Sequence, residues 1–495
     1  GLYKSTNAGQ LWQEVTPTMS DPKFVFRGVT VQDGNSNIVY AGGEIPDPSN
    51  ATGKTFGLVR GRVYKSMDGG QNWTPIFEED NLTRYIIIHP GDPNTIYLSL
   101  GIFDREAYDS KCTSDPPDQG TGGVVKTTNG GIKWDFMNNG LTDMNVGSLV
   151  MHPANPDILL AGAGNNACSP YTDGSQTKYT GGVFITTDGG KNWTKTLAND
   201  IITAVEFSPS NPQIAYAGSR AYFYRSEDGG WTWEKVAGHT FPWGPAGVVS
   251  GFPIDILVDP IDPAILFVNN YGGSNVKSTD GGATWQLASK GYTGALMFDI
   301  AAHPGGNNTV YAAARSGVFR STDGGDTWQG LTYSPAHLIE SYSVAVHPTQ
   351  PNIVLASQEE GGVLYRSTTG GTSWSQVDQI IPRNVGEKNG YKRFAFAPSN
   401  PQIVYGGTCR EHNTLNGDNT AQSFGVRKSA DAGSTWNPAN GGKLGTSCIN
   451  DLAVHPNKAN TVYAATAASG LWKTEDGGTS WNKLNALTPS DVRSV

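Results

Sequence analysis

The stretch Ser66-Met67-Asp68-Gly69-Gly70-Gln71-Asn72-Trp73 decides the fold, because the same eight-residue pattern recurs from one end of the chain to the other. The pattern reads Ser/Thr-x-Asp/Asn/Thr-x-Gly-x-x-Trp, and successive copies start 40 to 62 residues apart. The ten copies are Ser5–Trp12, Ser66–Trp73, Thr127–Trp134, Thr186–Trp193, Ser226–Trp233, Ser278–Trp285, Ser321–Trp328, Ser367–Trp374, Ser429–Trp436 and Thr474–Trp481. A period of this length is typical of an array with one supersecondary unit per repeat.

Each repeat predicts four short strands. An alternating apolar run at 204–207 leads into a proline turn, further β runs follow at 213–218 and 222–225, and the pattern joins the third strand to a fourth that starts at Trp233. Turn residues separate the runs and no helical periodicity is present. Four-stranded sheets repeated radially form a β-propeller. The predicted fold class is therefore all-β, a single β-propeller of about ten four-stranded blades.

The pattern itself is expected to build the turn between the third and fourth strands. Its Ser or Thr hydroxyl and its carboxylate accept hydrogen bonds from the turn backbone, its Gly permits a positive φ, and its Trp buries a large ring between sheets. Asn7, Asn129 and Thr369 replace the aspartate in three copies, as a structural turn tolerates. A structural role is therefore predicted for the remaining aspartates, which are Asp68, Asp188, Asp228, Asp280, Asp323, Asp431 and Asp476.

The pattern resembles the Asp-box, or bacterial neuraminidase repeat, of sialidases, xyloglucanases, sortilin-type receptors and photosystem II assembly-factor propellers. The resemblance covers essentially the whole chain, but those families share the box and little else, so it predicts fold rather than function. Sialidases resemble six-bladed rings, and xyloglucanases resemble paired seven-bladed rings that need a much longer chain. The ten boxes are closest in number to the ten-bladed sortilin-type domains.

One domain is predicted, a single propeller over residues 1–495. Ten boxes give nine complete four-strand units and an opening pair of strands around the first box. We expect these N-terminal strands to close the ring with the C-terminal ones. Because the chain begins at Gly1 inside a repeat and the closing blade lacks a strand, we also expect the natural chain to continue beyond both ends.

The amino-acid composition argues against some classes of binding partner. The formal charge of −9 argues against nucleic acid, which needs a basic face. No apolar run reaches the length of a membrane-spanning helix. Charged residues are only 16% of the chain, and glycosylation sequons begin at Asn50, Asn81 and Asn307. These features favour an extracellular or cell-surface protein.

The resemblance implies that the boxes lie on one face and the loops between second and third strands on the other. Long insertions occur there at 42–62, 101–123, 162–182 and 408–425, and 234–253 should reach the same face. Loops on a rigid scaffold are the usual place for binding, although they can also merely cover the channel. The predicted ligand-binding residues on this face are Trp243, Tyr108, Tyr171 and Arg410. Trp243 could stack on a sugar ring, and packing beside two prolines is the alternative.

The four cysteines fall in the same loops. The blade map predicts the pairs Cys112–Cys168 and Cys409–Cys448, with isolated free thiols as the alternative. Disulfides form in oxidising compartments. No Cys-x-x-Cys and no clustered histidines support a metal site, so neither a metal nor another cofactor is predicted.

Hydrolysis of a glycosidic bond needs two carboxylates across that bond. The catalytic candidates in the loops are Asp104, Glu106, Asp109, Glu44 and Glu411, from a wider acidic set with Asp47, Asp115, Asp118, Glu359 and Glu360. Each is equally compatible with a solvated loop carboxylate. The sialidase resemblance carries over no residue, because the segment nearest to its Arg-Ile-Pro motif, 26–29, lacks Ile-Pro. Neither catalytic aspartate of the xyloglucanases can be placed.

The sequence thus leaves two functions open. The preferred interpretation is a secreted or cell-surface binding or scaffold module that holds a protein, peptide or glycan on its looped face. The alternative is a glycoside hydrolase acting on a polysaccharide, similar to xyloglucanases rather than sialidases. Self-assembly into a surface layer or filament cannot be separated from the first interpretation by sequence. Whether the protein is an enzyme is left open.

Overall fold

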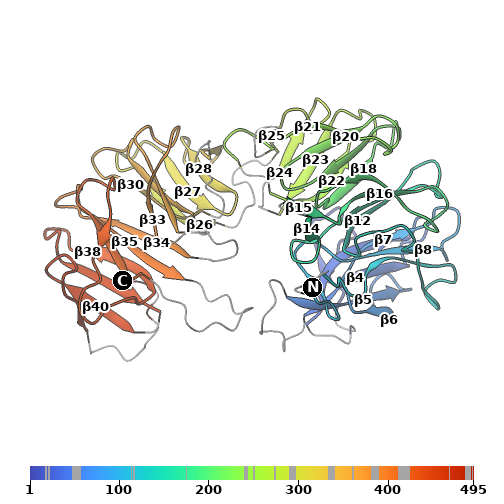
Figure 1. Cartoon of the computed structure of the whole chain (residues 1–495), viewed down its shortest axis with the longest axis horizontal. Helices are drawn as coiled ribbons and strands as arrows, with labels where there is room; N and C mark the ends of the chain where they lie inside the picture. The colour runs from blue at the N-terminus through green and yellow to red at the C-terminus, as the bar shows by residue number, and fades with distance from the viewer. Residues whose placement is uncertain are drawn as a thin grey trace. The chain divides into compact units, whose positions relative to one another are not determined.

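The computed structural model describes residues 1–16, 19, 23–46, 57–112, 114, 117–173, 176–238, 243–248, 251–271, 275–288, 297–332, 341–358, 362–380, 389–410, 424–467, 469–484, 492 and 494. The chain divides into two compact units. The first holds residues 1–243, 252–269 and 277–284, and the second holds 244–251, 270–276 and 285–495. The regular elements within these ranges are all β-strands, which confirms the predicted all-β class (Figure 1).

Nine sheets follow the predicted four-strand order, each strand beside its neighbour in the sheet. Those early in the chain are β3–β6 (Val25–Val31, Val39–Pro46, Leu58–Ser66, Thr74–Glu79), β7, β8, β10 and β11 (Thr83–Ile88, Ile96–Leu100, Gly123–Thr127, Asp135–Phe136), β12, β13, β16 and β17 (Val146–Met151, Leu159–Ala163, Gly182–Thr186, Thr194–Ala198), and β18–β21 (Ala204–Phe207, Ala215–Gly218, Phe223–Ser226, Glu234–Ala237). Next come β22–β25 (Pro253–Val258, Leu266–Asn270, Asn275–Ser278, Gln286–Leu287) and β26–β29 (Met297–Ala302, Val310–Ala314, Gly317–Ser321, Gln329–Gly330). The last three are β30–β33 (Ser341–Val346, Val354–Gln358, Val363–Ser367, Ser375–Gln379), β34–β37 (Asn389–Phe396, Val404–Arg410, Val426–Ser429, Asn437–Pro438) and β38–β41 (Ile449–Val454, Val462–Thr466, Gly470–Thr474, Asn482–Lys483).

Three smaller pieces complete the described strands. The opening pair β1 (Tyr3–Lys4) and β2 (Gln13–Glu14) surrounds the first box, as the repeat predicted. A hairpin of β14 (Pro170–Asp173) and β15 (Gln176–Tyr179) lies inside an inserted loop. The short strand β9 (Glu106–Ala107) adds a parallel pairing to the edge of β5, so this insertion is anchored to the preceding blade.

Within each unit the blades are arranged about their first strands. In the first unit β3, β7, β12, β18 and β22 contact one another in series, and in the second unit β26, β30, β34 and β38 do so. Apolar side chains fill the space between sheets; one such core joins Tyr97 and Val124 of one sheet to Val146 and Leu159 of the next. This is the blade packing of a propeller. The single ring over residues 1–495, its closure and a continuation beyond both ends stay predictions.

The box is a hydrogen-bonded turn. In Ser66–Trp73, the Ser66 hydroxyl accepts the Gly70 N–H at 2.8 Å and donates to Asp68 at 2.8 Å. The same Asp68 oxygen accepts the Asn72 N–H at 2.9 Å. These hydrogen bonds, led by those with Asn72, lower the pKa of Asp68 to about 2. The carboxylate is therefore ionised and occupied by its own turn at neutral pH.

Five box tryptophans join successive blades in the same way. The indole N–H of Trp73 donates to the Val15 carbonyl, which lies three residues after the preceding box tryptophan. The donors Trp134, Trp193, Trp374 and Trp481 reach Ile76, Met137, Leu331 and Ala439 with the same offset. Burying such a ring contributes about 2 to 3 kcal/mol. The boxes therefore hold the blades together.

Candidate functional site

The two disulfides are those that the blade map predicted. Cys112 is bonded to Cys168, and Cys409 is bonded to Cys448. All but Cys448 belong to the buried core. Each bond ties two successive blades; Cys409 lies at the end of β35, and the other three cysteines lie in loops.

Glu44 is fully engaged by arginines. It lies at the end of β4 with 3% of its side chain exposed, and it accepts hydrogen bonds from Arg27 at 3.1 and 2.7 Å. Arg105, from the next inserted loop, lies 3.5 Å away. Two parallel hydrogen bonds from one arginine hold a carboxylate in a single orientation. The contacts therefore make Glu44 an anchor between the two loops.

The other described loop carboxylates also hold their loops. Asp104 is buried and its carboxylate lies 3.3 Å from Arg105. Glu106 is buried in β9, close to the Cys112–Cys168 bond. Asp109 accepts the backbone N–H of Thr121 at 2.9 Å and its hydroxyl at 2.7 Å. Their part in a reaction stays a prediction. Asp118 accepts the Gly120 N–H at 3.1 Å. The remaining candidates, Glu411, Asp47, Asp115, Glu359 and Glu360, lie outside the described residues.

Trp243 does not present its ring to a ligand. Only 2% of it is exposed, its indole N–H donates to the Ser219 carbonyl at 2.9 Å, and it packs against Phe223. The structure thus gives Trp243 the packing role that was the alternative, because the loop closes over a bulky apolar ring whose single donor is satisfied. The predicted ligand-binding role of Trp243 is corrected accordingly.

The other predicted ligand-binding residues are placed less completely. Tyr108 is 37% exposed, and the Arg60 guanidinium covers one ring face at 4.0 Å. Tyr171 lies in β14 and Arg410 ends β35, but the side chains of both are outside the described part of the structure. Ligand binding by these three residues stays a prediction.

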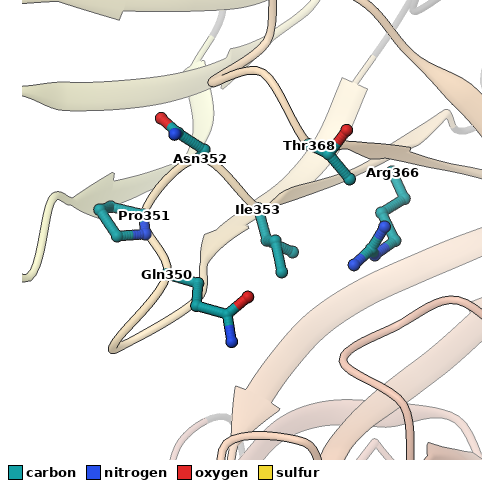
Figure 2. A pocket seen from close by; sticks show the side chains of 6 residues that line it. All are labelled: Gln350, Pro351, Asn352, Ile353, Arg366 and Thr368. Atoms are coloured by element: carbon teal, nitrogen blue, oxygen red, sulfur yellow. The ribbon is translucent and has the colours of Figure 1, made fainter.

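Two further features, a group of residues with metal-ligand spacing and a pocket, do not form a reaction site. Among the described residues, the one group with the spacing of metal ligands is Glu106 with Cys112 and Cys168. Both sulfurs are used in the disulfide, so the group does not fit a metal ion. A pocket in the second unit lies between the turn at 350–353 and the end of β32, where the box of the same blade begins (Figure 2). Its lining is Gln350, Pro351, Asn352, Ile353, Arg366 and Thr368, with no carboxylate among the six for acid–base chemistry.

A cluster on the first strands of the first unit brings together residues that the sequence analysis did not select. Arg84 of β7 is buried and donates to the carbonyls of Gly147, Thr203 and Ile254, at 2.7 Å in the first case. It thereby joins β7 to β12, to the start of β18 and to β22. The next residue, Tyr85, donates its hydroxyl to Asp255 of β22 at 2.9 Å.

Glu206 of β18 completes this cluster, named here the inner carboxyl cluster (Tyr85, Glu206 and Asp255). Burial, with a smaller contribution from the nearby Asp255 carboxylate, raises the pKa of Glu206 to about 8. The Phe207 N–H, 3.0 Å from Glu206 Oε1, opposes the shift. Asp255 itself is exposed. A protonated carboxyl beside a second carboxyl is the arrangement that acid–base catalysis uses.

The second unit has a different cluster on its first strands. Arg393 of β34 pairs with Asp299 of β26 at 2.5 Å and lies 3.6 Å from Asp451 of β38. Asp299 also accepts the Val344 N–H at 3.2 Å. Burial raises the pKa of Asp299, and Arg393 opposes the shift. The arginine therefore neutralises carboxylates from two blades.

The comparisons with known proteins match the fold. A family model described as BNR/Asp-box repeat matches residues 184–195, and one described as sortilin, neurotensin receptor 3, matches residues 274–405. The chain is an Asp-box β-propeller. The predicted recognition is therefore confirmed.

Curated relatives of this propeller are xyloglucanases. One from Hypocrea jecorina is 32% identical over 153 residues, which are 29% of this chain and 18% of the relative. One from Paenibacillus sp is 26% identical over 54% of this chain and 24% of its own length. A probable oligoxyloglucan-reducing end-specific xyloglucanase from Neosartorya fischeri is 25% identical over 65% of this chain and 38% of its own length. The chain spans less than two fifths of these relatives.

Solved structures that align with this chain include two GH74 proteins. The enzyme from Niastella koreensis aligns with a TM-score of 0.34 and 14% identity, over 93% of this chain and 78% of that one. The xyloglucanase from Xanthomonas campestris aligns with a TM-score of 0.31 and 16% identity, over 81% and 73%.

The preferred functional prediction, a binding or scaffold module, is contradicted by the xyloglucanase relatives, which favour the alternative of hydrolysis. That prediction gave weight to a box count close to that of sortilin-type domains. The number of boxes reflects how many blades the chain builds and carries no information about the chemistry between them.

In the described part of the chain, no helix is both long and apolar enough to cross a membrane.

Proposed function

We propose that this Asp-box propeller is a glycoside hydrolase that cleaves a polysaccharide of the xyloglucan type. The observation that carries the proposal is the similarity to xyloglucanases, which extends over 65% of the chain in one alignment. The bracing of the blades supports it, because a polymer substrate needs a rigid surface that positions a glycosidic bond against carboxyl groups.

The same proposal includes an extracellular location. A polysaccharide of this kind must be met outside the cell that makes the enzyme, and two disulfides suit an oxidising compartment. The predicted loop residues Glu44, Asp104, Glu106 and Asp109 contribute by bracing the loops around the substrate, as their ion pairs and hydrogen bonds support.

The test is hydrolysis by the purified full chain. Xyloglucan is incubated with the protein across a range of pH values, and products are separated by anion-exchange chromatography; unsubstituted cellulose and mannan serve as matched polymers. We expect oligosaccharides from xyloglucan at a rate well above that from either control. Retention of xyloglucan on the protein without any released product would contradict the proposal and return a binding role to consideration.

A further inference from the structure

The inner carboxyl cluster joins three blades of the first unit at one point. Tyr85 comes from β7, Glu206 from β18 and Asp255 from β22. The hydroxyl of Tyr85 reaches Asp255 Oδ1 at 2.9 Å across 170 residues of sequence. The strands β12 and β18 lie between β7 and β22 in the contact series, so Tyr85 reaches Asp255 past two intervening blades. The convergence is therefore a product of the blade arrangement.

The surrounding backbone fixes both carboxyl groups. Glu206 Oε1 accepts the Phe207 N–H at 3.0 Å, and Asp255 Oδ1 accepts the Ile256 N–H at 3.1 Å. Arg84 connects the strands beneath them through its three carbonyl partners. Gly28 of β3 permits the close approach of β7, because a Cβ there would lie 2.0 Å from the Arg84 carbonyl oxygen. The frame that holds the pair is thus rigid.

One oxygen of each carboxyl group is left for another molecule. Across the described ranges, no protein group donates a hydrogen bond to Glu206 Oε2 or to Asp255 Oδ2. A carboxyl oxygen that is neither bonded to the protein nor paired with a cation can receive a substrate hydroxyl, a water or a glycosidic oxygen. Glycoside hydrolysis uses two carboxyl groups, and these two lie on the neighbouring strands β18 and β22.

The charged and titratable neighbours of Glu206 can be named for each strand that packs against it. Asp255 of β22 acts electrostatically on Glu206, and Tyr85 of β7 donates its hydroxyl to Asp255. Tyr216, opposite Glu206 on β19, donates its own hydroxyl to the Pro263 carbonyl. From β12 the neutral Ser148 accepts the Val205 N–H. Burial, with a smaller contribution from Asp255, therefore favours the protonated form of Glu206.

We propose that Glu206 and Asp255 are the catalytic carboxyl pair of this propeller, with Tyr85 as the residue that positions Asp255. This inference rests on the proposed hydrolase function and assigns residues to it. Glu206 gives its proton to the glycosidic oxygen while the bond from that oxygen to the anomeric carbon breaks. Asp255 takes a proton from the water whose oxygen bonds to the same carbon. Proton exchange with solvent then restores both groups, and one water is consumed per bond.

The protonation of Glu206 and the hydrogen bonds of Asp255 support these roles. A general acid must hold its proton at the working pH, and the pKa of Glu206, raised to about 8, keeps it protonated at neutral pH. The exposed Asp255 accepts hydrogen bonds from Tyr85 and Ile256, which fix the position of its carboxyl group.

Substitutions at the pair test the assignment. Glu206→Gln should lower kcat on xyloglucan by roughly 10²- to 10⁴-fold, the usual contribution of a general acid. On an aryl glycoside with a good leaving group the same variant should lose far less, since protonation of the leaving oxygen is no longer needed. Asp255→Asn should lose activity on both substrates. A merely structural role for Glu206 would lower both rates alike.

The controls remove equivalent carboxylates from the same two blades. Glu227→Gln changes an exposed residue that pairs with Arg225 at 3.1 Å, and Asp262→Asn changes an exposed turn residue after β22. Both should keep wild-type rates within twofold. Thermal unfolding checks each protein, and if Glu206→Gln does not fold, Asp255→Asn and Tyr85→Phe carry the test. A Glu206→Gln protein that is folded and hydrolyses xyloglucan within twofold of wild type would overturn the assignment.

A binding measurement separates this inference from the proposed function. The iminosugar 1-deoxynojirimycin carries a protonated ring amine, which the Asp255 carboxylate is expected to bind. Calorimetry should show binding to the wild-type chain, at least tenfold weaker in Asp255→Asn and unchanged in Asp262→Asn. If xyloglucan is not cleaved but this pattern holds, the site stands and the hydrolase function fails. Equal binding by wild type and Asp255→Asn overturns the site even where xyloglucan is cleaved.

Discussion

The first strands of the two units carry similar charged side chains and use them differently. In the first unit Arg84 donates to three carbonyls, and no described cation lies within ion-pair distance of Glu206 or Asp255. In the second unit Arg393 lies against Asp299 and Asp451. Burial raises the pKa of Glu206 and of Asp299, but an arginine opposes that shift only at Asp299.

The difference indicates that the role of a buried carboxyl group depends on whether the nearby arginine pairs with that carboxyl group or with backbone carbonyls. When an arginine pairs with the carboxyl, the charge is neutralised and the group serves to join blades. When the arginine satisfies backbone carbonyls instead, the carboxyl keeps its proton and becomes available as an acid. We therefore assign proton transfer to the first unit and blade cohesion to the Arg393 cluster.

The largest effect is expected from Arg84→Met, which tests whether the carbonyl contacts support the first cluster. The substitution leaves buried carbonyls of Gly147 and Ile254 without their charged donor. Hydrogen bonds to charged groups contribute about 1.5 to 3 kcal/mol each, so the free energy of unfolding should fall by about 3 to 4 kcal/mol. Urea unfolding followed by tryptophan fluorescence measures it.

Arg60→Met is the matched control for that prediction. Arg60 also contacts a tyrosine ring and an aspartate, but its side chain is 45% exposed. Exposed pairs contribute at most about 1 kcal/mol. Equal losses in the two variants would show that the Arg84 contacts do not organise the inner strands, and the contrast between the clusters would lose its basis.

The sequence predicted the frame because the box repeats its chemistry in every blade. The turn residues at Ser66–Trp73 act locally, so their pattern is readable without the fold. The disulfides were also predictable, since placing two loops on adjacent blades leaves few pairings. The preference for binding over hydrolysis was wrong because it drew chemistry from the number of boxes.

The inner carboxyl cluster was not predicted, because its members are far apart in sequence and only the blade arrangement joins them. A signal was nevertheless present. Glu206 and Asp255 each lie between apolar residues of a first strand, in Val205-Glu206-Phe207 and Ile254-Asp255-Ile256. A charged residue inside such a strand is costly unless it is paired or functional. The loop carboxylates attracted attention instead because insertions usually carry function.

The second largest effect is expected in the pH dependence of the free energy of unfolding. Glu206 has a folded pKa near 8 against a reference of 4.5, so its contribution to stability is present at low pH and is lost as pH rises toward 8. One group changes the free energy of unfolding by at most about 1.4 kcal/mol per pH unit. Because Glu206 is partly accessible, we expect a loss of about 2 kcal/mol between about pH 5 and pH 8.

Glu206→Gln should flatten this dependence, and Glu227→Gln should leave it unchanged. Urea midpoints measured at several pH values in one ionic strength provide the comparison. If the wild type and Glu206→Gln follow parallel curves, the carboxyl does not hold its proton in the folded protein. The proposed general acid would then lose its supporting ionisation.

The smallest effect is expected from Arg393→Met. This substitution removes the arginine from the cluster with Asp299 and Asp451, so that its carboxyl groups lack a paired cation, as in the inner carboxyl cluster. Its side chain is 40% exposed, so loss of the pairs with Asp299 and Asp451 should cost about 1 kcal/mol at neutral pH. Without the arginine the pKa of Asp299 rises further, so stability should be lost as pH rises and regained as the carboxyl is protonated in acid. A cost that is the same at about pH 4 and pH 7 would show that Arg393 acts by packing alone. Charge would then not be what distinguishes the two clusters.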